Sequence, residues 1–278
     1  GRRKQQEREK GKKKKKKNKE TTEGDNNNDE RKDDDQNDDD ETRKKLVRFL
    51  FIKCPTFQRI VTLFQLMDES NRNRPYEDAA RGPAPGNVRF LAVASVAISA
   101  ALQSSTSTTS VAEANAVTQD PVRRALVNDF PAHPKLRHPV AVVADLARAY
   151  RHFGNLTAHL LMLLLKLATP GPRYVADCDV LRKCGFYDAL VDVINYHSAN
   201  YGDPSLCGFA LEVFCTVCYH TSGLQRESVL RVRVVLRDIA RAGGRDAAHR
   251  FVKHPFAKSL GPRTAGLLTS ILALPADR

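Results

Sequence analysis

The fold class can be read from two neighbouring segments, Cys184-Gly-Phe-Tyr-Asp-Ala-Leu-Val-Asp-Val-Ile194 and Ala210-Leu-Glu-Val-Phe-Cys-Thr-Val-Cys-Tyr-His220. In both, apolar residues recur at the three- and four-residue spacing that places them on one side of a helix. The connection between the segments contains Gly, Asp and Pro, which interrupt regular structure. We therefore predict two helices, Phe186–His197 and Pro204 to about His220.

Helical spacing of apolar residues continues on both sides of this pair. Prolines, glycines and polar runs separate the expected helices, because these residues break or cap helical structure. The expected helices begin at Leu46 and at Pro55, and then cover Asn87–Gln103, Asp120–Val127, Pro139–His152, Leu156–Ala168 with Asn155 as its cap, Val175–Cys184 and Leu224–Ala242. Pro75–Gly86 and Ser104–Ser110 are expected to be loops.

The helix expected at Leu224–Ala242 has a competing interpretation. Its segment Leu230–Val234 alternates apolar and basic residues, a pattern typical of a strand. Over the longer window, Val229, Val232, Leu236 and Ile239 form an apolar stripe at helical spacing. We therefore predict a helix here and an all-α chain.

The first 45 residues differ sharply from the rest. They contain no aliphatic, aromatic or sulfur-containing residue, whereas residues 46–278 are about 49% apolar. A segment without apolar side chains cannot offset the entropy lost on ordering. We expect a disordered charged arm at 1–45, followed by an α-helical domain at 46–278.

The charged arm consists of two opposed blocks. Residues 1–20 carry a net charge of +9 and residues 21–41 a net charge of −9. The run Lys12–Lys17 is typical of nuclear-import signals and of patches that bind nucleic-acid phosphates. A solvated tail whose blocks neutralise each other fits the same pattern.

Composition excludes several other classes. The longest uncharged apolar run, Phe90–Leu102, falls short of the roughly 20 residues of a transmembrane helix, so we expect no membrane partner. Six cysteines are too few for a disulfide scaffold in a chain of 278 residues. This low cysteine content indicates that the protein resides in a reducing compartment. We expect a cytoplasmic location, with the nucleus as the alternative.

The segment Cys184–His220 resembles an armadillo-type helical repeat. A glycine precedes a helix that carries Leu190-Val191, and a longer helix follows with Ala210-Leu211 in the seam between the two. The resemblance is clearest over Val180–Gly243. A shift of 50 residues, which places Leu156 on Leu206, extends it into the preceding part of the chain. What it implies is an armadillo-like α-solenoid that binds another protein on a helical face.

Candidate metal and catalytic residues have structural alternatives. Cys207, Cys215, Cys218 and His220 could ligate zinc, but Cys215 and Cys218 lie in an apolar run where thiols serve as small hydrophobic side chains. We favour a role of these cysteines in the hydrophobic core and expect no metal or cofactor.

Paired carboxylates also admit two interpretations. Asp188 and Asp192 share a helix face and could act as acid and base, but the first turn of a helix favours anions without any catalysis. Asp177 and Asp179 are expected to be structural in the same way, as cap or first-turn residues of the helix at about Val175–Cys184. The histidines follow no repeated spacing, and the chain carries no nucleophile elbow or phosphate-binding loop. We expect no enzymatic activity.

The candidate partner-binding residues are basic. Arg233, Arg237 and Arg241 recur every fourth residue, and like charges at that spacing repel each other. Arg226, Arg231 and Arg245 are expected to widen the patch. An acidic protein surface or nucleic-acid phosphate could use it, and a solvated helix surface is the neutral alternative. We therefore predict a non-catalytic protein–protein interaction scaffold, with a nucleic-acid-associated helical protein as the alternative.

Overall fold

The structure is a computed structural model that describes residues 45, 48–72, 85–102, 120–132, 136–171, 174–199, 202–218 and 225–275. It divides the chain into two compact units, Gly1–Phe49 and Leu50–Arg278. In the first unit, Lys45, Arg48 and Phe49 are described, and all three are helical. The predicted disordered arm, with Lys12–Lys17, therefore lies outside the described residues except for Lys45. So does the loop expected at Ser104–Ser110. Of the loop expected at Pro75–Gly86, residues 75–84 also lie outside the described residues, but Pro85 and Gly86 already belong to a helix, so the expected end of this loop is wrong.

Regular structure in the described part of the second unit is helical, apart from isolated bridge residues such as Gly171 and Tyr174. The predicted all-α class is thereby confirmed. Most helices come in successive pairs whose members contact each other. The pairs are α3 (Pro55–Arg72) with α4 (Pro85–Ala101), α6 (Pro139–Ala149) with α7 (Gly154–Ala168), α9 (Phe186–His197) with α10 (Pro204–Cys218), and α12 (Gly244–Phe251) with α13 (Pro262–Leu272).

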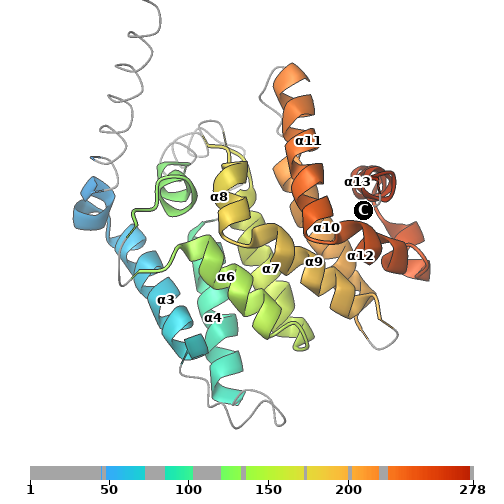
Figure 1. Cartoon of the computed structure of the whole chain (residues 1–278). Coiled ribbons are helices and arrows are strands. Elements are labelled where there is room, and N and C mark those ends of the chain that lie inside the picture. The colour runs from blue at the N-terminus through green and yellow to red at the C-terminus, as the bar shows by residue number, and fades with distance from the viewer. Residues whose placement is uncertain are drawn as a thin grey trace, which may run out of the picture. The chain divides into compact units, whose positions relative to one another are not determined.

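Equivalent members of the pairs stack on each other. The first members α3, α6, α9 and α12 contact one another in that order, and so do the second members α4, α7, α10 and α13. Figure 1 shows the pairs following one another from α3 and α4 in blue and cyan to α12 and α13 in red. The second unit thus has two layers of helices, an arrangement compatible with a helical repeat.

An additional helix precedes each of the last three pairs. A helix at 120–127 comes before α6, α8 (Cys178–Lys183) before α9, and α11 (Gln225–Arg241) before α12. A short 3₁₀ helix, η2 (Pro255–Ser259), connects α12 to α13. The helices after Gly244 lie beyond the last element that the sequence analysis assigned.

Two glycines occupy matching positions in successive pairs. Gly185 precedes α9 with φ 69° and Gly243 precedes α12 with φ 79°, a left-handed conformation that glycine adopts without penalty. The sequences there are Gly185-Phe-Tyr-Asp-Ala and Gly243-Gly-Arg-Asp-Ala, and the second helices begin at Pro204 and Pro262. All these counterparts are 58 residues apart. This internal repeat was missed by the 50-residue shift, which aligns α7 with α10 instead.

Helix α7 is part of the core and contacts α4, α6 and α10. Its leucines face these three neighbours, and burying one leucine side chain stabilises the fold by roughly 1.5–3 kcal/mol. The buried leucines are Leu156, Leu160, Leu161, Leu163, Leu164 and Leu167. Helix α7 begins at Gly154 after the N-cap position Phe153, so the expected cap at Asn155 is wrong.

A buried arginine holds the ends of two helices. Arg123, in the helix at 120–127, is 4% exposed and donates hydrogen bonds to Leu102 O at 3.0 Å and Thr169 O at 3.1 Å. These carbonyls end α4 and α7, where the helix dipole attracts a cation. Burial lowers the pKa of Arg123, and the charge of Asp120 opposes that effect. Arg123 thereby fixes the C-terminal ends of two stacked helices.

Candidate interaction surfaces

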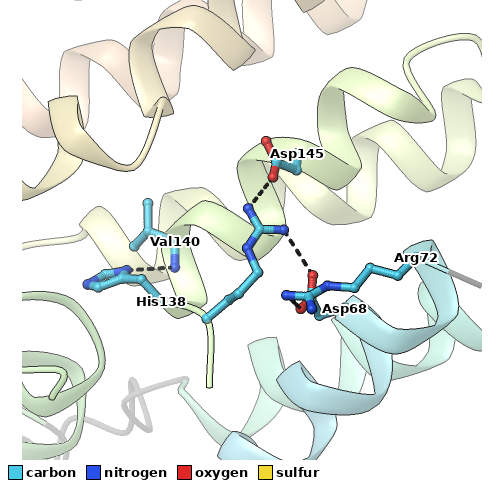
Figure 2. A network of polar contacts seen from close by, with 6 residues as sticks. Asp68, Arg72, His138, Val140 and Asp145 are labelled. Carbon is cyan, nitrogen blue, oxygen red and sulfur yellow. Dashed lines mark hydrogen bonds and ion pairs between the residues drawn. The ribbon is translucent and has the colours of Figure 1, made fainter. Parts of the chain in front are cut away.

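A polar network joins α3 to the start of α6 (Figure 2). Arg137 donates hydrogen bonds to Asp68 Oδ1 at 3.0 Å and to Asp145, and Asp68 also pairs with Arg72 at 2.6 Å. Burial lowers the pKa of Arg137, but the hydrogen bonds and charges of Asp145 and Asp68 outweigh it and raise the pKa. The guanidinium therefore stays charged and clamps α3 against α6.

A small cleft lies beside this network. Its volume is about 80 Å³, far below the roughly 300–1,000 Å³ typical of small-molecule sites. Asp68 at its edge pairs with Arg72 and Arg137, and both apolar and polar side chains form its walls. It is lined by Val61, Phe64, Gln65, Asp68, Glu69, Arg72, Phe130, Leu136, Arg137, Pro139 and Val142. The cleft fits a packing junction between α3 and α6 better than a ligand site.

The cysteines considered for zinc are core side chains of α10. Cys207 and Cys218 are fully buried and Cys215 is 7% exposed. Burial raises their pKa values, to about 12 for Cys207 and Cys218 and about 11 for Cys215, so the thiols are protonated at neutral pH. Cys207 Sγ donates to Ile194 O at 3.6 Å, which ties α10 to α9. His220 lies outside the described residues.

The carboxylates singled out by the sequence are structural. Asp177 caps α8 by accepting hydrogen bonds from the backbone N–H groups of Asp179 and Val180, as predicted. Asp188 lies in the first turn of α9. Asp192 lies one turn further on, not in the first turn as expected, and pairs with Arg148 of α6 at 2.7 Å. The two aspartates of α9 thus have separate surroundings.

The predicted arginine patch falls on α11. Arg233, Arg237 and Arg241 are exposed, as their four-residue spacing suggested, and Arg245 is half-buried in α12. The side chain of Arg226 lies outside the described residues. That these arginines bind a partner stays a prediction.

Arg231 departs from the expectation. Its Nε donates to Val217 O at 2.6 Å and its Nη2 to Ala176 O at 2.7 Å, so it turns inward and caps the end of α10. It does not widen the exposed patch. The buried side of this helix is also rotated relative to the predicted apolar stripe. Val229 belongs to the predicted stripe but is 52% exposed, whereas Val235 lies outside the stripe and is fully buried, as is Ile239.

A buried aspartate explains part of this rotation. The side chain of Asp238 is 1% exposed, and its Oδ1 lies 3.6 Å from both Arg182 of α8 and Arg241 of α11. Neither carboxylate oxygen has a hydrogen-bond partner among the residues that the structure describes. An unpaired buried charge is costly, so these two arginines stabilise Asp238. Arg241 therefore stabilises a buried carboxylate in addition to being part of the exposed patch.

Helix α4 has an apolar surface on every side. Arg89 is its one charged residue. Its buried side packs on α7 and α3 through residues such as Leu91 and Ile98, which are fully buried. The opposite side is exposed and also apolar, with Val93 at 69% and Val96 at 49% exposure. Helices that are apolar all round are normally covered on all sides.

Histidine caps were missed by the sequence analysis. His138 Nδ1 accepts a hydrogen bond from the backbone N–H of Val140 at 3.2 Å and caps α6, while His254 Nδ1 accepts from Phe256 N–H at 3.1 Å and caps η2. Each histidine directly precedes a proline at the first helical position, where the missing N–H costs nothing. The dipeptide His-Pro is the sequence pattern from which both helix caps could have been predicted.

A third histidine fastens the connection between α9 and α10. His197 is buried, and its Nδ1 accepts a hydrogen bond from the backbone N–H of Asp203 at 3.0 Å. Burial lowers the pKa of His197, as it does for His138. Both rings are therefore neutral near pH 7, which keeps Nδ1 free to accept.

Comparisons with protein-family models, with curated proteins and with solved structures give no match for this chain. Within the described residues, the helices are too short or too polar to cross a membrane.

Proposed function

We propose that this protein is a non-catalytic protein–protein interaction scaffold built on an armadillo-like α-solenoid. The two stacked layers support a solenoid. The additional helix before each of the last three pairs, with a left-handed glycine before α9 and before α12, supports the armadillo type. The 58-residue repetition of Gly, Asp, Ala and Pro supports the same architecture.

The exposed apolar side of α4 carries the functional proposal. We define the α4 face as Phe90, Val93, Val96, Ala97 and Ala100, all of them exposed. An apolar surface that continues along one helix is typical of a protein-binding site. Covering a valine there would contribute roughly 1.5 kcal/mol to a complex. This surface favours a protein partner.

Capture from lysate with the immobilised full chain tests the proposal. The variant Val93→Lys places a charge in the centre of the α4 face, and Val252→Lys is the matched control because Val252 is also exposed, at 41%, after α12. After nuclease treatment we expect defined proteins to be retained by the original chain and by the control, but lost from Val93→Lys. If both variants retain the same proteins, or nothing remains after nuclease, the proposal is wrong.

The alternative is a nucleic-acid-associated helical protein. The net charge of +13 and the exposed Arg233 and Arg237 favour it. Phosphate binding releases counterions, so it weakens steeply between low and moderate salt. Recovery of nucleic acid alone, lost at moderate salt and unaffected by Val93→Lys, would support this function instead.

A further inference from the structure

Helix α11 exposes a line of mixed apolar and basic side chains. We define the α11 face as Val229, Leu230, Arg233, Arg237 and Arg241, in which the two apolar residues are neighbours and the arginines follow at three- and four-residue steps. Val229 is 52% and Leu230 55% exposed, and the three arginines are also exposed. Figure 1 shows the N-terminal half of α11 projecting beyond its neighbours. The apolar end of the face thus stands clear of the core.

The basic part of the α11 face is not neutralised. Among the described residues, no carboxylate lies within ion-pairing distance of Arg233 or Arg237, and Arg241 has a 3.6 Å contact to the buried Asp238. Like charges four residues apart on a helix repel each other and destabilise it. A negatively charged partner would remove this repulsion as well as pairing with the arginines.

The spacing of the charges indicates the form of that partner. Four residues of helix advance by about 6 Å, and alternate residues of an extended peptide lie about 6.5–7 Å apart on the same side. Carboxylates at alternate positions can therefore meet successive arginines. Aliphatic residues at one end of the same peptide would then cover Val229 and Leu230.

We propose that the α11 face binds an acidic segment of a partner protein, with carboxylates at alternate positions and an aliphatic pair at one end. This inference rests on the proposed function as a protein-binding scaffold. The apolar pair favours a protein segment over nucleic acid, because phosphates and sugars offer Val229 and Leu230 no apolar surface. The α11 face also lacks an aromatic side chain on which a base could stack.

Fluorescence anisotropy with the full chain tests the proposal. The probe is a labelled synthetic peptide of two leucines followed by aspartates that alternate with serines. The variant Arg233→Glu/Arg237→Glu reverses the charges that have no carboxylate partner and leaves Arg241 to stabilise Asp238. Lys253→Glu/Lys258→Glu is the matched control, since both lysines are exposed and neither makes an ion pair among the described residues.

We expect the arginine variant to bind the probe at least about tenfold more weakly, which corresponds to about 1.4 kcal/mol. The control should change the affinity much less. Binding of the peptide by Lys12–Lys17 would be common to both variants, so the difference between them reports on the α11 face. A probe with serines in place of the leucines should bind at least about threefold more weakly, because the complex then buries less apolar surface at Val229 and Leu230.

Two results would overturn the inference. One is equal weakening by the two variants, which would indicate attraction to overall charge. The other is binding of a single-stranded oligothymidylate as tight as that of the peptide, with no effect of the leucines, which would indicate a site for phosphates. Capture by the α4 face is measured with Val93→Lys, so the α11 inference can fail while the proposed function stands, and the reverse.

Discussion

Replacing Gly185 by alanine tests the left-handed junction between α8 and α9. The residue has φ 69°, and a Cβ at this position would meet no atom within 4 Å. The cost is therefore conformational, about 1–2 kcal/mol for a residue with a side chain in this region. The lower entropy of the unfolded alanine chain offsets about 0.4–1 kcal/mol of it. We expect the variant to lose about 1 kcal/mol of unfolding free energy.

Gly266→Ala is the matched control, because the same methyl group should there have the opposite effect. Gly266 lies inside α13 with helical backbone, and its Cβ would also meet no atom within 4 Å. Alanine in a helix interior is favoured over glycine by about 0.8–1 kcal/mol. We expect this variant to be more stable than the original chain by about that amount.

Urea unfolding followed by circular dichroism measures both variants. Each should shift the midpoint without changing the slope, since neither changes the surface exposed on unfolding. In thermal unfolding, 1 kcal/mol corresponds to about 2–4 °C for a domain of this size. If Gly185→Ala leaves the stability unchanged or raises it, the assigned left-handed junction is refuted, and with it the match to Gly243.

Three further expectations follow from buried groups. Arg123→Met leaves the last carbonyls of α4 and α7 without a donor and should lower the unfolding free energy by about 2–4 kcal/mol. A loss below about 1 kcal/mol in urea titration would contradict that role. Burial lowers the pKa of His138 and His197, so the stability from their neutral rings is present above about pH 6.5 and is lost as pH falls through the folded-state pKa. Urea midpoints between pH 7.5 and 5 should fall, and a flat profile would argue against both bonds. Cys207 and Cys218, each with a pKa raised to about 12, should react with iodoacetamide only after unfolding. Mass spectrometry checks this, and labelling of the native chain at the unfolded rate would contradict their burial.

Helix boundaries could be predicted because they depend on residues close in sequence. The bounds predicted for α9, Phe186–His197, are those observed. Asp177 was expected to cap a helix and does so by accepting from Asp179 N–H, two residues away. The exposure of Arg233 and Arg237 followed in the same way from charges repeated along one helix. The His-Pro caps are local too, but histidine is not among the usual capping residues.

The orientation of α11 could not be predicted, because its partners are remote in sequence. Arg231 turns inward to a carbonyl of Ala176, and Asp238 is held by Arg182 of α8. These contacts place charged residues on the buried side, where apolar periodicity alone puts none. The 58-residue repeat is present in the sequence as matching Gly, Asp, Ala and Pro residues, but Gly185 and Gly243 stand out among the glycines only once their positive φ angles are known.

By itself, the sequence determined that this chain forms helices, where most of them begin and end, and that Arg233, Arg237 and Arg241 face outward. Those properties come from local periodicity, capping and backbone restriction. Only the tertiary structure decided that the helices stack in two layers, that Arg231 turns inward, that Asp238 is buried, and that the described residues leave the α4 face uncovered. The reason is that a helix with apolar residues all round has no preferred side in the sequence. Its neighbours select the buried side, and the surface they leave is the one available to a partner.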